Sequence, residues 1–189
     1  MDSESLSIEK RKTRRRIKDI LSRVPCQQFS KEQATIEKKF QELPDYKKAE
    51  TIMFYWPLGR EVDTRKLIRK AKQDKKKIGL PVVIDQNNMQ PYEYTEENNL
   101  TKNSLGVREP DPDTAKKIEI EKLDIVVVPG IAFDKDNSRL GRGKGYYDRF
   151  LRRLSLKTKT IGLAFTFQRV ESLAFNPLSD QKVDLVISS

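Results

Sequence analysis

The residues best suited to chemistry form a glycine-rich segment, residues 141–145, in which glycine alternates with arginine and lysine. Glycines at every second position remove Cβ atoms from one face of the backbone, so its N–H groups can close on a bulky anion. Arg142 and Lys144 add positive charge to the same segment. The segment is therefore predicted to bind a phosphate group.

The spacing of these glycines matches neither of the two common phosphate-binding motifs. No Ser or Thr follows Lys144, as a P-loop requires, and the glycines are not spaced as in the dinucleotide fingerprint. An ordinary glycine-rich connection that lets a loop turn into a helix is the alternative interpretation. The residues on either side of the segment shift the balance toward a phosphate site.

The chemistry open to this chain is limited by the absence of histidine from its 189 residues. Without imidazole there is no Ser-His or Cys-His nucleophile pair, no histidine general base and none of the commonest zinc sites. The single cysteine, Cys26, lacks a cysteine or histidine partner and is interpreted as a small buried side chain. The remaining groups suit phosphoryl transfer, where a protein mainly positions the reactants and neutralises charge.

The chain is strongly basic: 38 Lys and Arg stand against 28 Asp and Glu, a formal net charge of +10. Such a charge favours anionic partners, including nucleic acid, nucleotides and polyanionic metabolites. A heavily solvated surface is the plainer interpretation, because a 35% content of charged residues also resembles the composition of heat-stable proteins. No apolar run is long enough to span a bilayer, so we expect a cytoplasmic protein with no membrane partner.

The apolar pattern predicts one domain over residues 1–189. A basic helix over residues 5–23 and a second helix that opens with a capping box at residues 30–33 are expected to form an antiparallel pair, over about residues 5–43, packed on this domain. Strands and helices then alternate. Strands are predicted at residues 51–56, 78–84, 124–129, 160–165 and 183–187, and helices at about residues 63–71 and 145–154.

This alternation predicts a single-domain, three-layer α/β/α fold of Rossmann-like type with a mostly parallel or mixed central sheet. Residues 85–123 are interpreted as a mostly irregular excursion that could include a short strand near residues 89–94. Such sheets bind ligands at the carboxyl ends of their strands, and the glycine-rich segment lies at such an end.

Two stretches around the glycines, residues 129–134 and 138–148, closely resemble the signature of the 5-formyltetrahydrofolate cyclo-ligases, also called 5,10-methenyltetrahydrofolate synthetases. Further similar stretches follow the family's order over nearly the whole chain. They are Lys10 with Arg14, residues 61–64, Gly106 with residues 109–110, and residues 161–165 with Gln168. The sequence departs from the family pattern at Asn137, where Gly is common, and at Ser179, where His is common. Asn tolerates left-handed backbone geometry, so the loop at Asn137 can survive the change.

The resemblance implies an ATP- and Mg²⁺-dependent reaction that converts 5-formyltetrahydrofolate to 5,10-methenyltetrahydrofolate, ADP and phosphate. In the family's proposed mechanism the formyl oxygen attacks the γ-phosphate, N10 of the folate captures the phosphorylated formyl carbon, and phosphate leaves. Because water would compete at the activated carbon, such a site must close over both substrates. The implied partners are these two small molecules, with no specific nucleic acid, and we expect a monomer.

The resemblance also implies roles for individual residues. Arg142, Lys144 and Tyr147 would be catalytic, the two cations by stabilising the transferring phosphoryl group. Asp148 and Asp180 would bind Mg²⁺. ATP would be bound by Lys10, Arg14, Arg139, Leu140, Gly141, Arg142, Gly143, Lys144, Gly145, Tyr146 and Tyr147, and the folate by Trp56, Glu61 and Tyr147.

Each of these roles has a structural alternative. Asp148 could cap or salt-bridge the helix after the loop, and the basic pair of the first helix could be solvated charges. Glu61 could be an acidic residue favoured by a helix dipole. Trp56 could be a core residue, and Tyr146 is expected to be the core residue of the tyrosine pair.

Two other functions compete with the cyclo-ligase. One is another nucleotide- or sugar-phosphate-binding α/β enzyme that uses the same loop with a different acceptor. The other is a basic nucleic-acid-binding protein led by the seven Lys and Arg between Lys10 and Lys18. Basic charge alone gives salt-sensitive binding without sequence preference. The sequence contains no helix-turn-helix, RNA-recognition signature or zinc finger that would add specificity.

Overall fold

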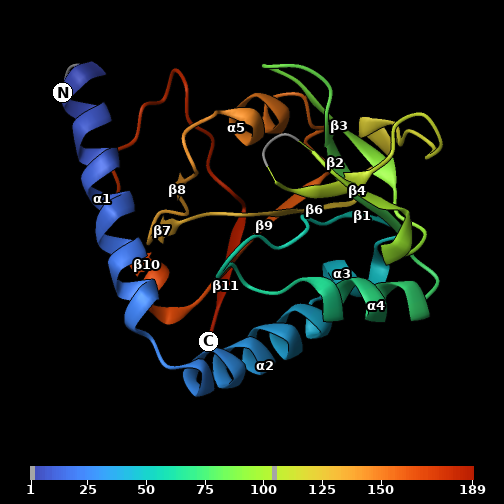
Figure 1. The fold of residues 1–189 in the computed structure, drawn as a ribbon, viewed down its shortest axis with the longest axis horizontal. Coiled ribbons are helices and arrows are strands. Elements are labelled where there is room, and N and C mark those ends of the chain that lie inside the picture. The colour runs from blue at the N-terminus through green and yellow to red at the C-terminus, as the bar shows by residue number, and fades with distance from the viewer. Residues whose placement is uncertain (1–2, 104–105) are drawn as a thin grey trace.

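The computed structural model describes residues 3–103 and 106–189, and residues 1–2 and 104–105 lie outside the described part. Its central sheet consists of β1 (Thr51–Met53), β2 (Lys77–Val83), β3 (Met89–Glu93), β6 (Ile125–Val128), β9 (Lys159–Ala164) and β11 (Leu185–Ser188). The six strands follow the order β11-β9-β6-β1-β2-β3 (Figure 1). β3 runs antiparallel to β2, and the other neighbours are parallel. This mostly parallel sheet confirms the predicted fold class.

Helices cover both faces of the sheet because its strands are apolar on both faces. In β6, Ile125 and Val127 pack into one core cluster, whereas Val126 and Val128 pack into another. Successive side chains of a strand point to opposite faces, so a continuous apolar run suits a strand buried between two layers. Figure 1 shows α2 (Cys26–Glu42), α3 (Pro44–Lys48) and α4 (Arg65–Gln73) on one face and α5 (Tyr146–Leu151) on the other. The predicted three layers are confirmed.

The N-terminal helices do not form the predicted antiparallel pair. Figure 1 shows α1 (Ser3–Arg23) along one side of the molecule, while α2 turns away to run under the sheet. α1 contacts the short helix η3 (Thr166–Gln168), and α2 contacts β11, α3 and α4. Pro25 precedes α2 in an extended conformation, with φ of −63° and ψ of 146°, and redirects the chain. Across the described residues, no helix is both long and apolar enough to cross a membrane.

The start of α2 also differs from the prediction. The helix begins at Cys26, so the predicted capping box at residues 30–33 lies inside it. There the Ser30 hydroxyl donates to the Cys26 carbonyl instead of capping the helix. Cys26 itself is exposed, contrary to the expectation of a buried thiol. A position in the first turn of a surface helix explains its exposure.

Residues 85–123 contain more regular structure than the sequence predicted. β3 lengthens the central sheet, and β4 (Leu100–Lys102) pairs with β5 (Arg108–Pro110). Two short helices, η1 (Glu97–Asn99) and η2 (Ile120–Lys122), accompany them. Asp85 shapes the β2–β3 turn, because its Oδ1 accepts the backbone N–H groups of Asn87 and Asn88. Single buried residues such as Met89 and Leu100, not apolar runs, anchor these elements, which explains why the pattern was missed.

A second sheet lies between the central sheet and α1. It consists of β7 (Ala132–Asp134), β8 (Arg139–Leu140) and β10 (Arg169–Val170), in the order β10-β7-β8. Asp134 closes the β7–β8 turn by accepting the backbone N–H groups of Asp136 and Ser138. Asn137 in this turn has φ of 60°, as its tolerance for left-handed geometry predicted. The hairpin delivers the chain to the glycine-rich segment.

α2 is fastened to the end of the chain by Glu32, a residue only 9% exposed. Its carboxylate accepts the Thr166 backbone N–H at 2.7 Å and the Ser189 hydroxyl at 2.8 Å. The Gln28 side-chain amide adds a third hydrogen bond at 2.8 Å. Burial alone would raise the pKa of Glu32, but these hydrogen bonds to the charged form outweigh burial and lower the pKa below its ordinary value.

Glu32 should therefore make folding sensitive to acid. A carboxylate whose pKa is lower in the folded state stabilises the protein above its unfolded pKa, and this stability is lost as the pH falls through the folded pKa. We expect the free energy of unfolding to drop between about pH 5 and pH 3, and to drop less in Glu32→Gln. Urea unfolding at both pH values measures this, with the exposed Glu42→Gln as control. An unchanged pH dependence in Glu32→Gln would contradict the assignment.

Candidate functional site

The glycine-rich segment, residues 141–145, is the loop that joins β8 to α5. We call it the glycine loop. Gly143 and Gly145 have φ of 106° and 71°, a region that other residues rarely adopt. Gly145 is also the N-cap of α5. Glycine is therefore required by the backbone at two of the three positions.

The glycines have a second role that the sequence analysis did not predict. Each lies against an arginine guanidinium, in the pairs Gly141 with Arg139, Gly143 with Arg14, and Gly145 with Arg149. A Cβ at Gly141 would lie 2.7 Å from Nη1 of Arg139, and one at Gly145 would lie 2.6 Å from Nη1 of Arg149. The missing Cβ atoms thus make room for positive charge beside the loop, in addition to freeing the backbone.

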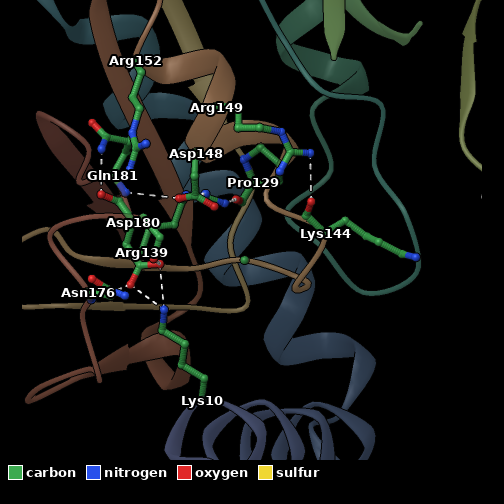
Figure 2. A network of polar contacts seen from close by, with 12 residues as sticks. Lys10, Pro129, Arg139, Lys144, Asp148, Arg149, Arg152, Asn176, Asp180 and Gln181 are labelled. Atoms are coloured by element: carbon green, nitrogen blue, oxygen red, sulfur yellow. Dashed lines mark hydrogen bonds and ion pairs between the residues drawn. The ribbon is translucent and has the colours of Figure 1, made fainter. Parts of the chain in front are cut away.

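α1 contacts the glycine loop through Arg14 and the neighbouring Asp180 through Lys10. The Lys10 ammonium donates to both carboxylate oxygens of Asp180, at 2.7 and 2.5 Å (Figure 2). Nε of Arg14 donates to the Gly141 carbonyl at 2.8 Å. These contacts exclude the alternative that both residues are merely solvated charges. They join the first helix to the loop and to a segment 170 residues away in sequence.

Asp148 forms an ion pair with Arg139, at 2.7 Å between Oδ1 and Nη2 (Figure 2). The Arg139 side chain is only 3% exposed, and its Nη1 also donates to the Pro129 carbonyl. The Gln181 backbone N–H donates to the same Asp148 oxygen at 3.2 Å. Asp148 therefore forms a salt bridge, with a partner from β8 before the loop and not from the helix after it. Arg139 thus supports the loop. Its Nε is buried without a hydrogen-bond partner among the described residues.

Glu61 lies across from the loop in the connection after β1. Its Oε1 accepts Nε and Nη2 of Arg142 at 3.0 and 2.8 Å, and its Oε2 accepts the Leu58 N–H at 2.9 Å. The Glu61 side chain is 14% exposed, whereas that of Arg142 is 51% exposed. Because α4 begins only at Arg65, Glu61 is outside its first turn, and the helix-dipole alternative is wrong.

Both tyrosines after the loop pack their rings against the same core cluster, but their hydroxyls differ. Tyr147 has its hydroxyl buried without a partner among the described residues, while Tyr146 donates to the Asp85 carbonyl at 3.1 Å in an exposed contact. Burial, and then the charge of Glu61, raise the pKa of Tyr147 well above its ordinary value. Its hydroxyl therefore stays protonated and can donate a hydrogen bond, but cannot act as a base.

Two further predicted residues belong to the core. Trp56 is 8% exposed and packs in the cluster under the sheet, with its ring 6.0 Å from that of Tyr94 and 5.6 Å from the Arg108 guanidinium. Leu140 is 2% exposed, and its carbonyl accepts the Ile131 N–H. The core alternative for Trp56 is confirmed, and any ligand contact of Leu140 would have to come from its backbone.

Lys144 differs from the other cations because its ammonium makes no hydrogen bond or ion pair with any described residue. It is exposed, and Figure 2 shows its side chain extending away from the Arg139–Asp148 pair. A phosphate could approach this ammonium without displacing a protein carboxylate. Lys144 is thus the most available charge in the loop.

Asp148 and Asp180 are suited to a magnesium ion only together with other ligands. The segment over residues 176–181 brings the two carboxylates together. The Gln181 backbone N–H donates to Asp148, and the Asn176 backbone N–H donates to Asp180. Within the described ranges, no cluster of three or more acidic, His or Cys side chains could hold a metal. Mg²⁺ commonly uses one or two carboxylates plus substrate phosphates. The pair fits that pattern.

The sequence analysis did not identify one residue that contacts the loop. Arg149 follows Asp148 in α5, and its Nη2 donates to the Lys144 carbonyl at 3.0 Å (Figure 2). Its position one helical turn after Gly145 was the available signal, because a side chain there points back toward the start of the helix.

The sheet and the cationic loop define an α/β protein with a candidate phosphate site at its strand ends. The model of the 5-formyltetrahydrofolate cyclo-ligase family matches residues 7–189. The chain therefore belongs to the 5-formyltetrahydrofolate cyclo-ligase family. The match includes α1, the glycine loop and the segment around Asp180.

Individual relatives agree with this assignment. The Escherichia coli 5-formyltetrahydrofolate cyclo-ligase is 33% identical over 128 residues, which cover 66% of this chain and 70% of the relative. A solved 5,10-methenyltetrahydrofolate synthetase from Mycoplasma pneumoniae superposes with a TM-score of 0.77 at 26% identity, covering 95% and 98% of the two chains. One from Aquifex aeolicus gives a TM-score of 0.81 at 29% identity, covering 94% and 88%.

Asp148 should be important for stability as well as for ligands. In Asp148→Asn the nearly buried Arg139 guanidinium loses its counter-charge, which should cost about 3 kcal/mol of unfolding free energy. Replacing both partners, with Arg139→Met and Asp148→Leu, should recover much of this loss, because two apolar groups leave no buried charge unpaired. Urea unfolding measures both, with the exposed Asp113→Asn as control. A loss no larger than that of Asp113→Asn would refute the structural role.

Proposed function

We propose that this chain catalyses the ATP-dependent cyclisation of 5-formyltetrahydrofolate to 5,10-methenyltetrahydrofolate, with release of ADP and phosphate. The observation that carries the proposal is that family membership extends over the glycine loop, where cations from α1, β8 and the loop itself surround one short segment. The formyl oxygen attacks the γ-phosphate of ATP, and ADP leaves. N10 of the folate then attacks the activated formyl carbon and loses its proton, and phosphate leaves that carbon to give the methenyl product.

The triphosphate binds beside the glycine loop, against Lys10 and Arg14 of α1. Asp180 and the Gly141 carbonyl already hold these two side chains in place. Cations fixed before the substrate arrives stabilise developing charge without reorganising at the moment of reaction. The family role of these residues in ATP binding is supported by this arrangement.

Arg142 and Lys144 stabilise the transferring phosphoryl group from the loop. Lys144 is free to meet it directly, whereas Arg142 spans the loop and Glu61. Tyr147, which remains protonated, donates a hydrogen bond toward the reacting oxygen atoms after a small rearrangement that exposes its hydroxyl. These three residues carry the proposed catalysis.

Glu61 binds the N–H edge of the pterin, where a carboxylate matches two donors. Its present partners, the Arg142 guanidinium and the Leu58 N–H, occupy the same oxygens. Binding of the folate therefore competes with the Glu61–Arg142 pair and releases Arg142 toward the phosphates. Folate binding and charge placement are linked in this way.

Asp148 and Asp180 are the residues that would hold Mg²⁺, an ion that neutralises phosphate charge when bound. Each carboxylate has a cationic partner, Arg139 for Asp148 and Lys10 for Asp180, which holds it in place. The remaining features follow the same proposal: one domain over residues 1–189, a monomer in the cytoplasm, and no specific nucleic-acid partner. Lys10 and Arg14, which would lead a nucleic-acid-binding face, instead bond Asp180 and the Gly141 carbonyl.

The reaction is tested by an absorbance time course of the purified protein with 5-formyltetrahydrofolate, ATP and Mg²⁺. The conjugated methenyl product absorbs where the substrate does not, and each component is omitted in turn as a control. We expect product only in the complete mixture. Binding of ATP without product would instead favour another phosphate acceptor for the same loop.

Lys144→Ala should lower turnover at least about a hundredfold and leave folding intact, because one preorganised charge in a closed site contributes a few kcal/mol to the transition state. The methenyl assay gives the turnover, and circular dichroism with thermal unfolding checks the fold. Lys135→Ala is the matched control, since that lysine pairs with Glu171 on the surface. Near-normal turnover of a folded Lys144→Ala protein would eliminate the role.

A further inference from the structure

The guanidinium of Arg149 lies against Gly145, the third glycine of the loop. Its side chain turns back along α5, so that Nη1 lies 2.6 Å from the position that a Cβ of Gly145 would take. The guanidinium is thus beside the N-terminus of the helix, the positive end of its dipole. A cation is disfavoured there, so the stability of α5 does not account for this placement.

The guanidinium of Arg149 joins two segments that are far apart in sequence. Nη2 donates to the Lys144 carbonyl at 3.0 Å, within the glycine loop. Nε donates to the Asn87 carbonyl at 2.6 Å, in the β2–β3 turn, and Nη2 also lies 3.4 Å from the Gln86 carbonyl. The planar fork reaches the two segments from separate nitrogens in a fixed geometry, whereas an ammonium has all its donors on one nitrogen of a flexible stem.

Tyr146 makes the same connection through a separate group. Its hydroxyl donates to the Asp85 carbonyl of the β2–β3 turn, and its ring lies 5.3 Å from the Arg149 guanidinium. Asp85 in turn holds the turn in shape through the N–H groups of Asn87 and Asn88. The turn therefore presents its carbonyls to α5 as a preformed unit.

We propose that Arg149 is a positioning residue that locks the glycine loop to the β2–β3 turn and so fixes the place of Lys144. The inference rests on the proposed function for its catalytic consequence, but the lock itself does not. Fixing the carbonyl of Lys144 fixes its Cα, from which the free ammonium extends. A misplacement of about 1 Å at a reacting group can cost up to about a hundredfold in rate.

The lock is tested first without any substrate. Hydrogen–deuterium exchange followed by mass spectrometry reports opening of backbone amides in residues 141–147 and 84–90. In Arg149→Ala both segments should exchange faster, because one side chain holds both. Arg153→Ala is the matched control, since Arg153 follows α5, is exposed and makes no side-chain hydrogen bond or ion pair with the described residues. Faster exchange in neither segment, or in only one, would overturn the proposal.

Kinetics then test the consequence. Arg149→Ala should lower kcat about tenfold or more while changing the KM for ATP less than about threefold, because the loss falls on the transition state. Arg149→Lys should not restore kcat, since it keeps the charge but not the fork. If Arg149→Ala does not fold, Arg149→Lys is judged by the same exchange and kinetic criteria. Unchanged kcat, or full rescue by lysine, would overturn the role.

The two proposals fail separately. If the wild-type protein makes no methenyl product, the proposed function fails, while the exchange experiment still decides whether Arg149 couples the two segments. If the wild-type protein is active and Arg149→Ala has wild-type kcat, the positioning role fails alone.

Discussion

The structure depends on the repulsion among positive charges gathered at one short loop. Cations from α1, β8, the loop and α5 lie in or beside it: Lys10, Arg14, Arg139, Arg142, Lys144 and Arg149. Like charges at this spacing repel, more strongly where water is excluded. Three carboxylates, those of Glu61, Asp148 and Asp180, balance part of this charge. Backbone carbonyls accept further N–H groups from Arg14, Arg139, Arg142 and Arg149. The cations still outnumber the carboxylates, so the loop retains an unbalanced positive charge suited to an anion.

Those counter-charges also organise the fold. Each carboxylate comes from a different place: the connection after β1, the start of α5, and the segment before β11. The Lys10–Asp180 pair fastens α1, which also meets the body through the Arg14–Gly141 hydrogen bond and the small cluster around Ile17. The Arg139–Asp148 pair fastens the second sheet to α5. The groups that prepare the loop for an anion are therefore also those that bring the N-terminal helix and the C-terminal segment to it.

Much of this was predictable from the sequence, for physical reasons. Buried parallel strands such as β6 appear as continuous apolar runs, and the family motif located the loop, Glu61, Asp148 and the basic pair of α1. The antiparallel pairing of α1 and α2 was wrong, because the direction of a chain after Pro25 depends on tertiary contacts. The β3–β5 region was missed, since isolated buried residues carry no period. The contacts between arginine guanidinium groups and the loop glycines also leave no local pattern in the sequence. Arg149 is the exception, because it follows Gly145 by one helical turn.

The cations fall into a buried group and an exposed group, and the two groups have different roles. Arg139 is almost fully buried, already paired and packed under Gly141, so it supports the loop and cannot reach a phosphate without a rearrangement. Lys144 is exposed and unpaired among the described residues, and Arg142 is half exposed and paired with Glu61. A buried guanidinium group stays with its partner, because separating the pair would leave a buried charge without compensation. The exposed cations, Arg142 and Lys144, can exchange partners at little cost. The mobile charge of the loop is therefore supported by the fixed charge of the buried Arg139.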